Sequence, residues 1–215
     1  MNDLDILVEF YENNKSCPKI HLEFDTGMTR SGFDHFDDKK VFNYLSKYPL
    51  LPVEGIYSHF ATADEGDLTY ADYQLQEFKR ILKNAKSSSI DLQYIHCSNS
   101  GSILNIPDSF FNTVRVGMLA YGVSPSKEVK MHINVEPVMS FCGPIVSTRK
   151  VNKNTLVSYG GVYKTKYSSN IAVIQTGFAD GLSREWFKDG YISYNGKHYK
   201  IAGRICMDQF MVDFK

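Results

Sequence analysis

Short strand-like and helix-like segments alternate along the first part of the chain, and this order leaves few folds open. In the strand-like stretch 19–25, Ile20, Leu22 and Phe24 share one face because they occupy every second position. We expect strands at 19–25, 53–60, 92–97 and 113–119, and helices at 37–47, 70–84 and 100–105. Strands separated by helices pair in parallel through crossover connections, so the order predicts a parallel α/β sheet.

The helix expected at 70–84 carries the strongest helical pattern in the sequence. Its apolar stripe comprises five residues at helical spacing, namely Tyr73, Leu75, Phe78, Ile81 and Leu82. A stripe of this width predicts that the helix packs one face against the sheet.

A second pattern begins near residue 136, where helical spacing disappears and β-type runs follow at 138–151, 155–163, 171–177, 190–194 and 198–214. The pair Asn195-Gly196 between two of these runs is a typical two-residue hairpin turn. We therefore expect an α/β domain over residues 1–135 and a β-rich domain over 136–215. Four strands are too few to close a barrel, and both ends of the chain read as interrupted.

Composition excludes several classes of partner. The chain has 24 Lys and Arg against 24 Asp and Glu, and this neutral balance gives no attraction to nucleic acid or to an anionic membrane. Apolar runs are too short to span a bilayer, and the acidic first ten residues lack a secretory signal. Four scattered cysteines suggest reduced thiols in a cytoplasmic protein, without metal-type spacing.

Polar residues gather where the predicted parallel strands end, which is where α/β sheets bind ligands. These residues are Asp25 to Arg30, His59, Ser98 to Ser100 and Arg115. An Arg in an apolar strand needs a partner group, because burying it unpaired is costly. Each feature also has an ordinary explanation: a solvated loop for Arg30, a hydrogen-bonded core histidine for His59, a helix cap for Ser100 and a structural ion pair for Arg115.

The β-rich part adds weaker signals. Tyr159 precedes two glycines and would project from a tight turn, although an isolated tyrosine is more often a packing residue. Met207 and Asp208 lie in a turn between strands, where neither is informative alone. Taken together and in order, seven strings are present: HxxxDTGMxRxGF, SHFATADE, HCSNS, VRxGxxxYGxxPS, VSYGxxY, GxADGxxR and GRxCMDQ.

These strings, from about Lys19 to Val212, resemble the alanine racemase family. The resemblance implies an isomerase with an eight-stranded (β/α) TIM-like barrel and a β-rich C-terminal domain, of which this chain holds part of each. It further implies a pyridoxal phosphate (PLP) cofactor, a homodimer with shared active sites, and a two-base interconversion of L- and D-alanine. The product would supply D-alanine for peptidoglycan.

The resemblance also implies roles for single residues. Tyr159 would be a catalytic base acting in the partner's site, connected through His59 to Arg115, which would hydrogen-bond the pyridine nitrogen. Ser100 with the amides of Gly117 and Met118 would hold the cofactor phosphate. Arg30 would lie near the cofactor oxygen and the substrate carboxylate. The backbone of Met207 would also contact that carboxylate, with Asp208 beside it at the substrate site.

Three departures from the family pattern matter. The lysine that holds PLP covalently would precede Met1, so we expect this chain alone to be inactive. Glu23 occupies the place of a lysine that becomes carbamylated in many members, which suggests a direct pair between Glu23 and Arg30. Phe178 replaces a common tyrosine near the substrate entrance. A serine or broad-specificity racemase and a non-catalytic racemase remnant remain alternative interpretations.

Overall fold

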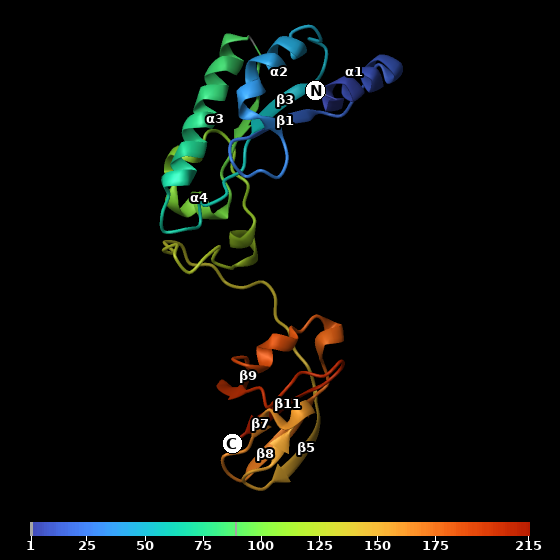
Figure 1. Ribbon diagram of the computed structural model, residues 1–215, viewed down its shortest axis with the longest axis vertical. Helices are drawn as coiled ribbons and strands as arrows, with labels where there is room; N and C mark the ends of the chain where they lie inside the picture. The colour runs from blue at the N-terminus through green and yellow to red at the C-terminus, as the bar shows by residue number, and fades with distance from the viewer. Residues whose placement is uncertain (1, 89) are drawn as a thin grey trace. The chain divides into compact units, whose positions relative to one another are not determined.

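The computed structural model describes residues 2–88 and 90–215 and divides into two compact units, Met1–Met139 and Ser140–Lys215 (Figure 1). Each unit has its own hydrophobic core. Within the described ranges, no helix is both long enough and apolar enough to cross a bilayer.

Unit 1 contains a four-stranded parallel sheet in the order β2-β1-β3-β4. Its elements in chain order are α1 (Asn2–Asn14), β1 (Ile20–Asp25), β2 (Phe33–Asp34), a 3-10 turn (His35–Asp37), α2 (Asp38–Leu45), β3 (Val53–Tyr57), α3 (Thr69–Ser87), β4 (Tyr94–His96), α4 (Ser100–Asn105) and two further 3-10 turns (Pro107–Ser109, Met118–Tyr121). The predicted parallel sheet with helical crossovers is confirmed.

Alternation along β1 separates the core from the polar face of this sheet. Leu22 and Phe24 are buried, while Glu23 between them stays partly exposed. Phe24 packs against Phe42 of α2, with ring centroids 5.6 Å apart. The helices α2 and α3 thus cover the apolar face of the sheet, and the opposite side carries the polar residues.

Three expectations for unit 1 were wrong. The first residues, to which the sequence assigned no element, form α1, because Leu4 and Val8 lie one turn apart and are both buried. Tyr73 does not belong to the buried stripe of α3; it is 45% exposed. The segment 113–119 is not a strand: the bond from the Arg115 amide to the Ser98 carbonyl connects it to the loop after β4, and a 3-10 turn starts at Met118.

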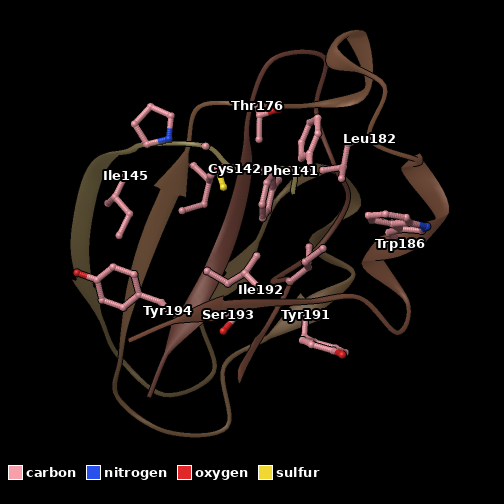
Figure 2. Close-up of a pocket in the computed structure, with 15 residues that line it drawn as sticks. Phe141, Cys142, Ile145, Thr176, Leu182, Trp186, Tyr191, Ile192, Ser193 and Tyr194 are labelled. Atoms are coloured by element: carbon pink, nitrogen blue, oxygen red, sulfur yellow. The ribbon is translucent and has the colours of Figure 1, made fainter. Parts of the chain in front are cut away.

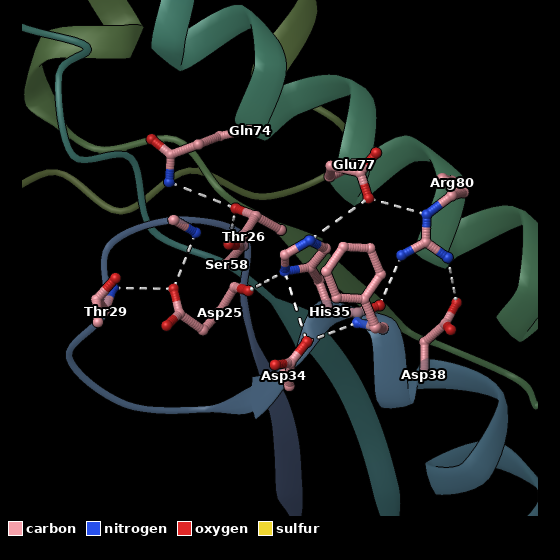
Figure 3. A network of polar contacts seen from close by, with 12 residues as sticks. Asp25, Thr26, Thr29, Asp34, His35, Asp38, Ser58, Gln74, Glu77 and Arg80 are labelled. Atoms are coloured by element: carbon pink, nitrogen blue, oxygen red, sulfur yellow. Dashed lines mark hydrogen bonds and ion pairs between the residues drawn. The ribbon is translucent and has the colours of Figure 1, made fainter.

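A polar network ties the helices of unit 1 to the loop after β1 (Figure 3). The carboxylate of Asp38, which is 1% exposed, accepts hydrogen bonds from Arg80 at 2.9 Å and Asn84 at 2.7 Å. Arg80 also donates to the backbone carbonyl of His35 at 2.6 Å. Because these donors lie on α3 and the acceptors at the start of α2, the network fixes the packing of the two helices.

Unit 2 consists of short antiparallel sheets, as the loss of helical spacing predicted. Its elements are β5 (Ile145–Val151), β6 (Leu156–Val157), a 3-10 turn (Tyr159–Gly161), β7 (Tyr163–Lys164), β8 (Ser169–Ile174), two further 3-10 turns (Phe178–Asp180, Arg184–Phe187), β9 (Tyr191–Tyr194), β10 (Lys197–Lys200) and β11 (Phe210–Phe214). The hairpin at Asn195-Gly196 is confirmed, with φ of 49° and 74° at its two central residues.

Several of the expected β runs in unit 2 are shorter than predicted. The run starting at residue 138 becomes a strand only from Ile145, and the run starting at 198 is interrupted by the turn that carries Met207.

An apolar pocket of about 710 Å³ opens beside β9, with Trp186, Tyr191 and Tyr194 on its wall (Figure 2). It is lined mainly by apolar groups and holds none of the residues singled out above.

Candidate active site

Parallel pairing brings polar side chains of three strands into register. Glu23 of β1 pairs with Tyr57 of β3, and Tyr57 pairs with His96 of β4. The rings of Tyr57 and His96 are stacked, with centroids 5.0 Å apart and an interplanar angle of 13°. At the carboxyl ends, Thr26 and Ser58 join their hydroxyls at 2.7 Å. The sheet therefore presents one continuous polar surface at the place where the sequence analysis expected a site.

Arg115 is the centre of this surface. One terminal nitrogen, Nη1, donates to Nδ1 of His96 at 2.6 Å and to its carbonyl at 3.2 Å. The other, Nη2, donates to the Ser58 carbonyl at 2.8 Å and to Nδ1 of His59 at 3.1 Å. The guanidinium carbon lies 5.2 Å from the centre of the Tyr57 ring. These partners are neutral, so Arg115 is not the simple structural ion pair that the sequence left open.

The bonding of Arg115 determines the protons around it. A guanidinium has five N–H donors and no acceptor, so both histidines must accept through an unprotonated Nδ1. Burial and the positive charges of Arg115 and Arg30 lower the pKa of His59. Among the described residues, the Nε–H of Arg115 has no hydrogen-bond partner. One directed donor thus remains available to a ligand.

A pocket of about 360 Å³ joins several of the predicted site residues. His59, Ser100, Arg115, Gly117 and Met118 all line it. Ser100 is 6% exposed, and its hydroxyl oxygen accepts from the amides of Gly117 at 3.0 Å and Leu119 at 3.3 Å. A Cβ atom at Gly117 would lie 3.7 Å from that oxygen, which is an ordinary van der Waals contact.

The expected direct pair between Glu23 and Arg30 is not present. The Glu23 carboxylate accepts from the hydroxyls of Ser31 at 2.9 Å and Tyr57 at 3.1 Å, and Arg30 is exposed. Both hydroxyls bond the same carboxylate oxygen, Oε2, and within the described residues Arg30 forms no ion pair with Glu23. The Arg30 charge still lowers the pKa of His59, which places the two in electrostatic range.

The predicted residues of unit 2 lie on its surface. Tyr159 is 67% exposed, and it follows Ser158, which has a φ of 67°. Met207 is 60% exposed, and Asp208 beside it is exposed as well. A pocket of about 460 Å³ is lined by Ser158, Tyr159, Gly160 and Cys206, so the phenol lies near the turn that carries Met207. None of the three side chains is buried within its own unit.

Sequence reasoning gave no role to His96 or His21. Nδ1 of His21 lies 2.8 Å from Nε2 of His96. The other ring nitrogen of His96, Nδ1, contacts Arg115. The contact depends on the register of the parallel strands, which the sequence does not give: His21 and Tyr94 both pair with Gly55, and His96 follows Tyr94 by two positions.

Comparison with known proteins decides the family. Residues 1–125 match the family described as "Alanine racemase, N-terminal domain", and residues 138–215 match "Alanine racemase, C-terminal domain". This chain belongs to the alanine racemase family. A curated "Alanine racemase" of Clostridium tetani is 41% identical over 199 residues, which is 91% of this chain and 51% of that protein.

Solved structures agree with this assignment. "Alanine Racemase from Streptomyces coelicolor A3(2)" has a TM-score of 0.90 and 30% identity, covering 100% of this chain and 57% of that one. The alanine racemase of Bartonella henselae, described with covalently bound pyridoxal phosphate, has a TM-score of 0.83 and 26% identity, covering 98% and 56%. The expected fold, part of an α/β barrel followed by a β-rich domain, is confirmed. The chain spans about half the length of the curated relatives it matches.

Proposed function

We propose that this chain supplies part of the active site of a PLP-dependent alanine racemase, an isomerase that interconverts L- and D-alanine. The observation that supports it best is the arrangement of Arg115 and His59 beside Ser100, Gly117 and Met118 in one pocket. In this proposal, residues 1–135 belong to the PLP-binding barrel and 136–215 to the β-rich domain. The protein would act in the cytoplasm and provide D-alanine for peptidoglycan, a location compatible with its four free cysteines.

The described residues fit the cofactor. Arg115 would donate its free Nε–H to the pyridine nitrogen, while its four Nη hydrogens stay with protein acceptors. The Ser100 hydroxyl and the Met118 amide would hold the phosphate. The Gly117 amide donates to the Ser100 oxygen in this structure, and it would join them by exchanging that bond for one to the phosphate. When bound, PLP acts as the electron sink that acidifies the α-hydrogen of the amino acid. Because a guanidinium donates and does not accept, Arg115 would keep the pyridine nitrogen unprotonated.

Racemisation needs a proton-transfer group on each face of the α-carbon. We assign one of them to Tyr159 of the partner subunit, because Tyr159 is exposed and not packed into its own unit. A free phenol titrates near pH 10 and needs a hydrogen-bond donor to ionise more easily. His59 accepts from Arg115 through Nδ1, so its Nε2–H is left to donate to that phenol oxygen.

Substrate binding would rest on three further residues. Arg30 is exposed on the loop after β1 and lies in electrostatic range of His59, so its guanidinium would meet the substrate carboxylate. The backbone of Met207, with Asp208 beside it, would contact the same carboxylate from the β-rich domain of the partner subunit. Their exposure on one turn supports this assignment. A homodimer follows from the proposal because the two groups of residues would come from different subunits.

A subunit-mixing experiment tests the shared site in the full-length polypeptide that carries these residues. Arg115→Lys and Tyr159→Phe are each expected to abolish D-alanine formation from L-alanine. Mixed dimers of the two variants regain one intact site, so random mixing should recover about one quarter of the wild-type activity. The exposed Tyr167→Phe in the same unit is the matched control and should stay active.

Three results would contradict the proposal. Absence of recovery on mixing would place both residues in one subunit's site. A higher kcat/KM for L-serine than for L-alanine would instead favour the serine or broad-specificity racemase. Absence of any turnover by the full-length wild type would favour a non-catalytic remnant.

A further inference from the structure

We propose that His96 and His21 are positioning residues for Arg115, connected in a chain whose protons are ordered in one direction. The proposal rests on the function proposed for Arg115 and adds two residues that do not contact the cofactor. Nη1 of Arg115 lies 2.6 Å from Nδ1 of His96, and Nε2 of His96 lies 2.8 Å from Nδ1 of His21.

The direction of the chain follows from the chemistry of its first member. Arg115 can only donate, so Nδ1 of His96 must carry a lone pair. The ring proton of His96 is therefore on Nε2, where it points at His21. His21 in turn must accept through Nδ1. A protonated His96 would break the bond to Arg115, because both of its nitrogens would then be donors.

The rings of the chain are held in place by aromatic neighbours. Tyr57 stacks on His96, and Tyr94 stacks on His21 with centroids 5.4 Å apart and an interplanar angle of 23°. Tyr57 is fixed in turn by donating its hydroxyl to Glu23 at 3.1 Å. The imidazole planes are thus set by β1, β3 and β4 together.

Gly55 in the middle of β3 provides the space for His21. The two residues are direct partners in the parallel register. A Cβ atom at position 55 would lie 2.7 Å from Nδ1 of His21, closer than real Cβ contacts allow. Glycine weakens a strand interior, and its presence here is explained by this close approach.

The consequence for the site is a fixed guanidinium. Four acceptors surround the two Nη groups, and the one on His96 is held by a second histidine. With the Nη groups immobilised, Nε–H keeps a single direction. His21 therefore acts through His96 to orient the Nε–H of Arg115, the donor that we assign to the pyridine nitrogen.

The test reads the imidazole protons in the full-length polypeptide that carries these residues, with ¹⁵N-labelled histidine at pH 7. We expect His96 to be neutral, with its proton on Nε2 and that proton protected from exchange with water. His21→Phe keeps an aromatic ring on Tyr94 but removes the acceptor. Exchange of the His96 proton should then become about fivefold faster, the factor that one neutral hydrogen bond is typically worth.

Three further variants separate this role from a general structural one. His21→Asn returns an acceptor near the Nδ1 position and should restore most of the protection. Gly55→Ala displaces the His21 ring without changing it and should act like His21→Phe. His198 also stacks on a tyrosine, Tyr191, at 4.4 Å and 23°, so His198→Phe is the matched control and should leave His96 unchanged.

The inference is overturned if His96 carries its proton on Nδ1, is charged at pH 7, or keeps full protection in the His21→Phe variant. This readout uses no cofactor and no substrate. A failed proton order in a working racemase would refute the chain alone, whereas a correct order in a protein without racemase activity would refute the proposed function alone.

Discussion

Nη2 of Arg115 lies 3.1 Å from Nδ1 of His59, and this contact joins the segment after β4 to the end of β3. Replacing His59 by Ala leaves one guanidinium hydrogen without a partner in a half-buried place. We expect His59→Ala to lower the free energy of unfolding of unit 1 by about 1–2 kcal/mol. Urea denaturation followed by circular dichroism at 222 nm measures it, because the described α-helices all lie in unit 1.

Two variants serve as controls for this effect. His59→Asn keeps an acceptor near the position of Nδ1 and should recover part of the loss. His132 is exposed in the same unit, so His132→Ala should change stability by less than about 0.5 kcal/mol. Equal losses at positions 59 and 132 would show that the Arg115 contact contributes nothing.

Acid should destabilise unit 1 through His96. Burial and the Arg115 charge lower the pKa of His96 to about 4, from an ordinary value of 6.5. The unfolded chain therefore binds this proton at higher pH than the folded chain, and stability falls as the pH drops from about 6.5 to about 4. The shift corresponds to a loss on the order of 3 kcal/mol.

Urea denaturation at a series of pH values measures this loss. The variant His96→Gln removes the titrating group, so its stability should depend less on pH over that window. His132→Ala should retain the wild-type dependence. A wild-type profile that is flat between pH 6.5 and 5 would contradict the lowered pKa.

The buried carboxylate of Asp38 should matter far more than its neighbour in sequence. Asp38 accepts from Arg80 and Asn84, so Asp38→Ala leaves Nη1 of Arg80 and the side-chain amide of Asn84 without this acceptor, although Arg80 keeps its bonds to Glu77 and to the His35 carbonyl. We expect a loss of roughly 2–4 kcal/mol in the unfolding of unit 1. Asp37 has a half-exposed carboxylate 3.8 Å from Lys40, and Asp37→Ala should cost less than about 0.5 kcal/mol. Similar losses for both variants would rule out the network of Figure 3 as the cause.

The cysteines should differ sharply in reactivity. Burial raises the pKa of Cys97 to about 12, so at pH 8 only about one thiol in ten thousand is ionised. Cys142 is exposed. Iodoacetamide followed by mass spectrometry should find Cys142 modified in the native protein and Cys97 only after unfolding in urea. Native labelling of Cys97 at the rate of Cys142 would disprove its burial.

The sequence alone predicted those elements in which the spacing of apolar residues, or the identity of the turn residues, directly indicates the structure. Leu22 and Phe24 alternate with polar residues in β1, and the structure buries both. Asn195-Gly196 predicted its turn because few other dipeptides accept a positive φ at both positions. Polar residues at strand ends likewise predicted which residues line the candidate site together, since the topology of a parallel sheet brings those ends together.

The failures arose where the outcome depends on contacts distant in sequence. The apolar segment at 113–119 has the composition of a strand. Its backbone hydrogen bond from the Arg115 amide goes to the carbonyl of Ser98, which lies in the loop after β4 and not in the strand itself. For Glu23 the sequence suggested Arg30 as the partner, and only the fold shows that Ser31 and Tyr57 reach it. His96 and His21 lie 75 positions apart, so spacing along the chain gave no indication of their contact.

The missing side chain at position 55 has an evolutionary consequence. Any larger residue there would intrude on the imidazole at position 21, and an imidazole at 21 tolerates no larger neighbour. Among homologous chains, these two sites should accordingly change as a pair. In a double-mutant cycle their energetic effects should depart from simple addition.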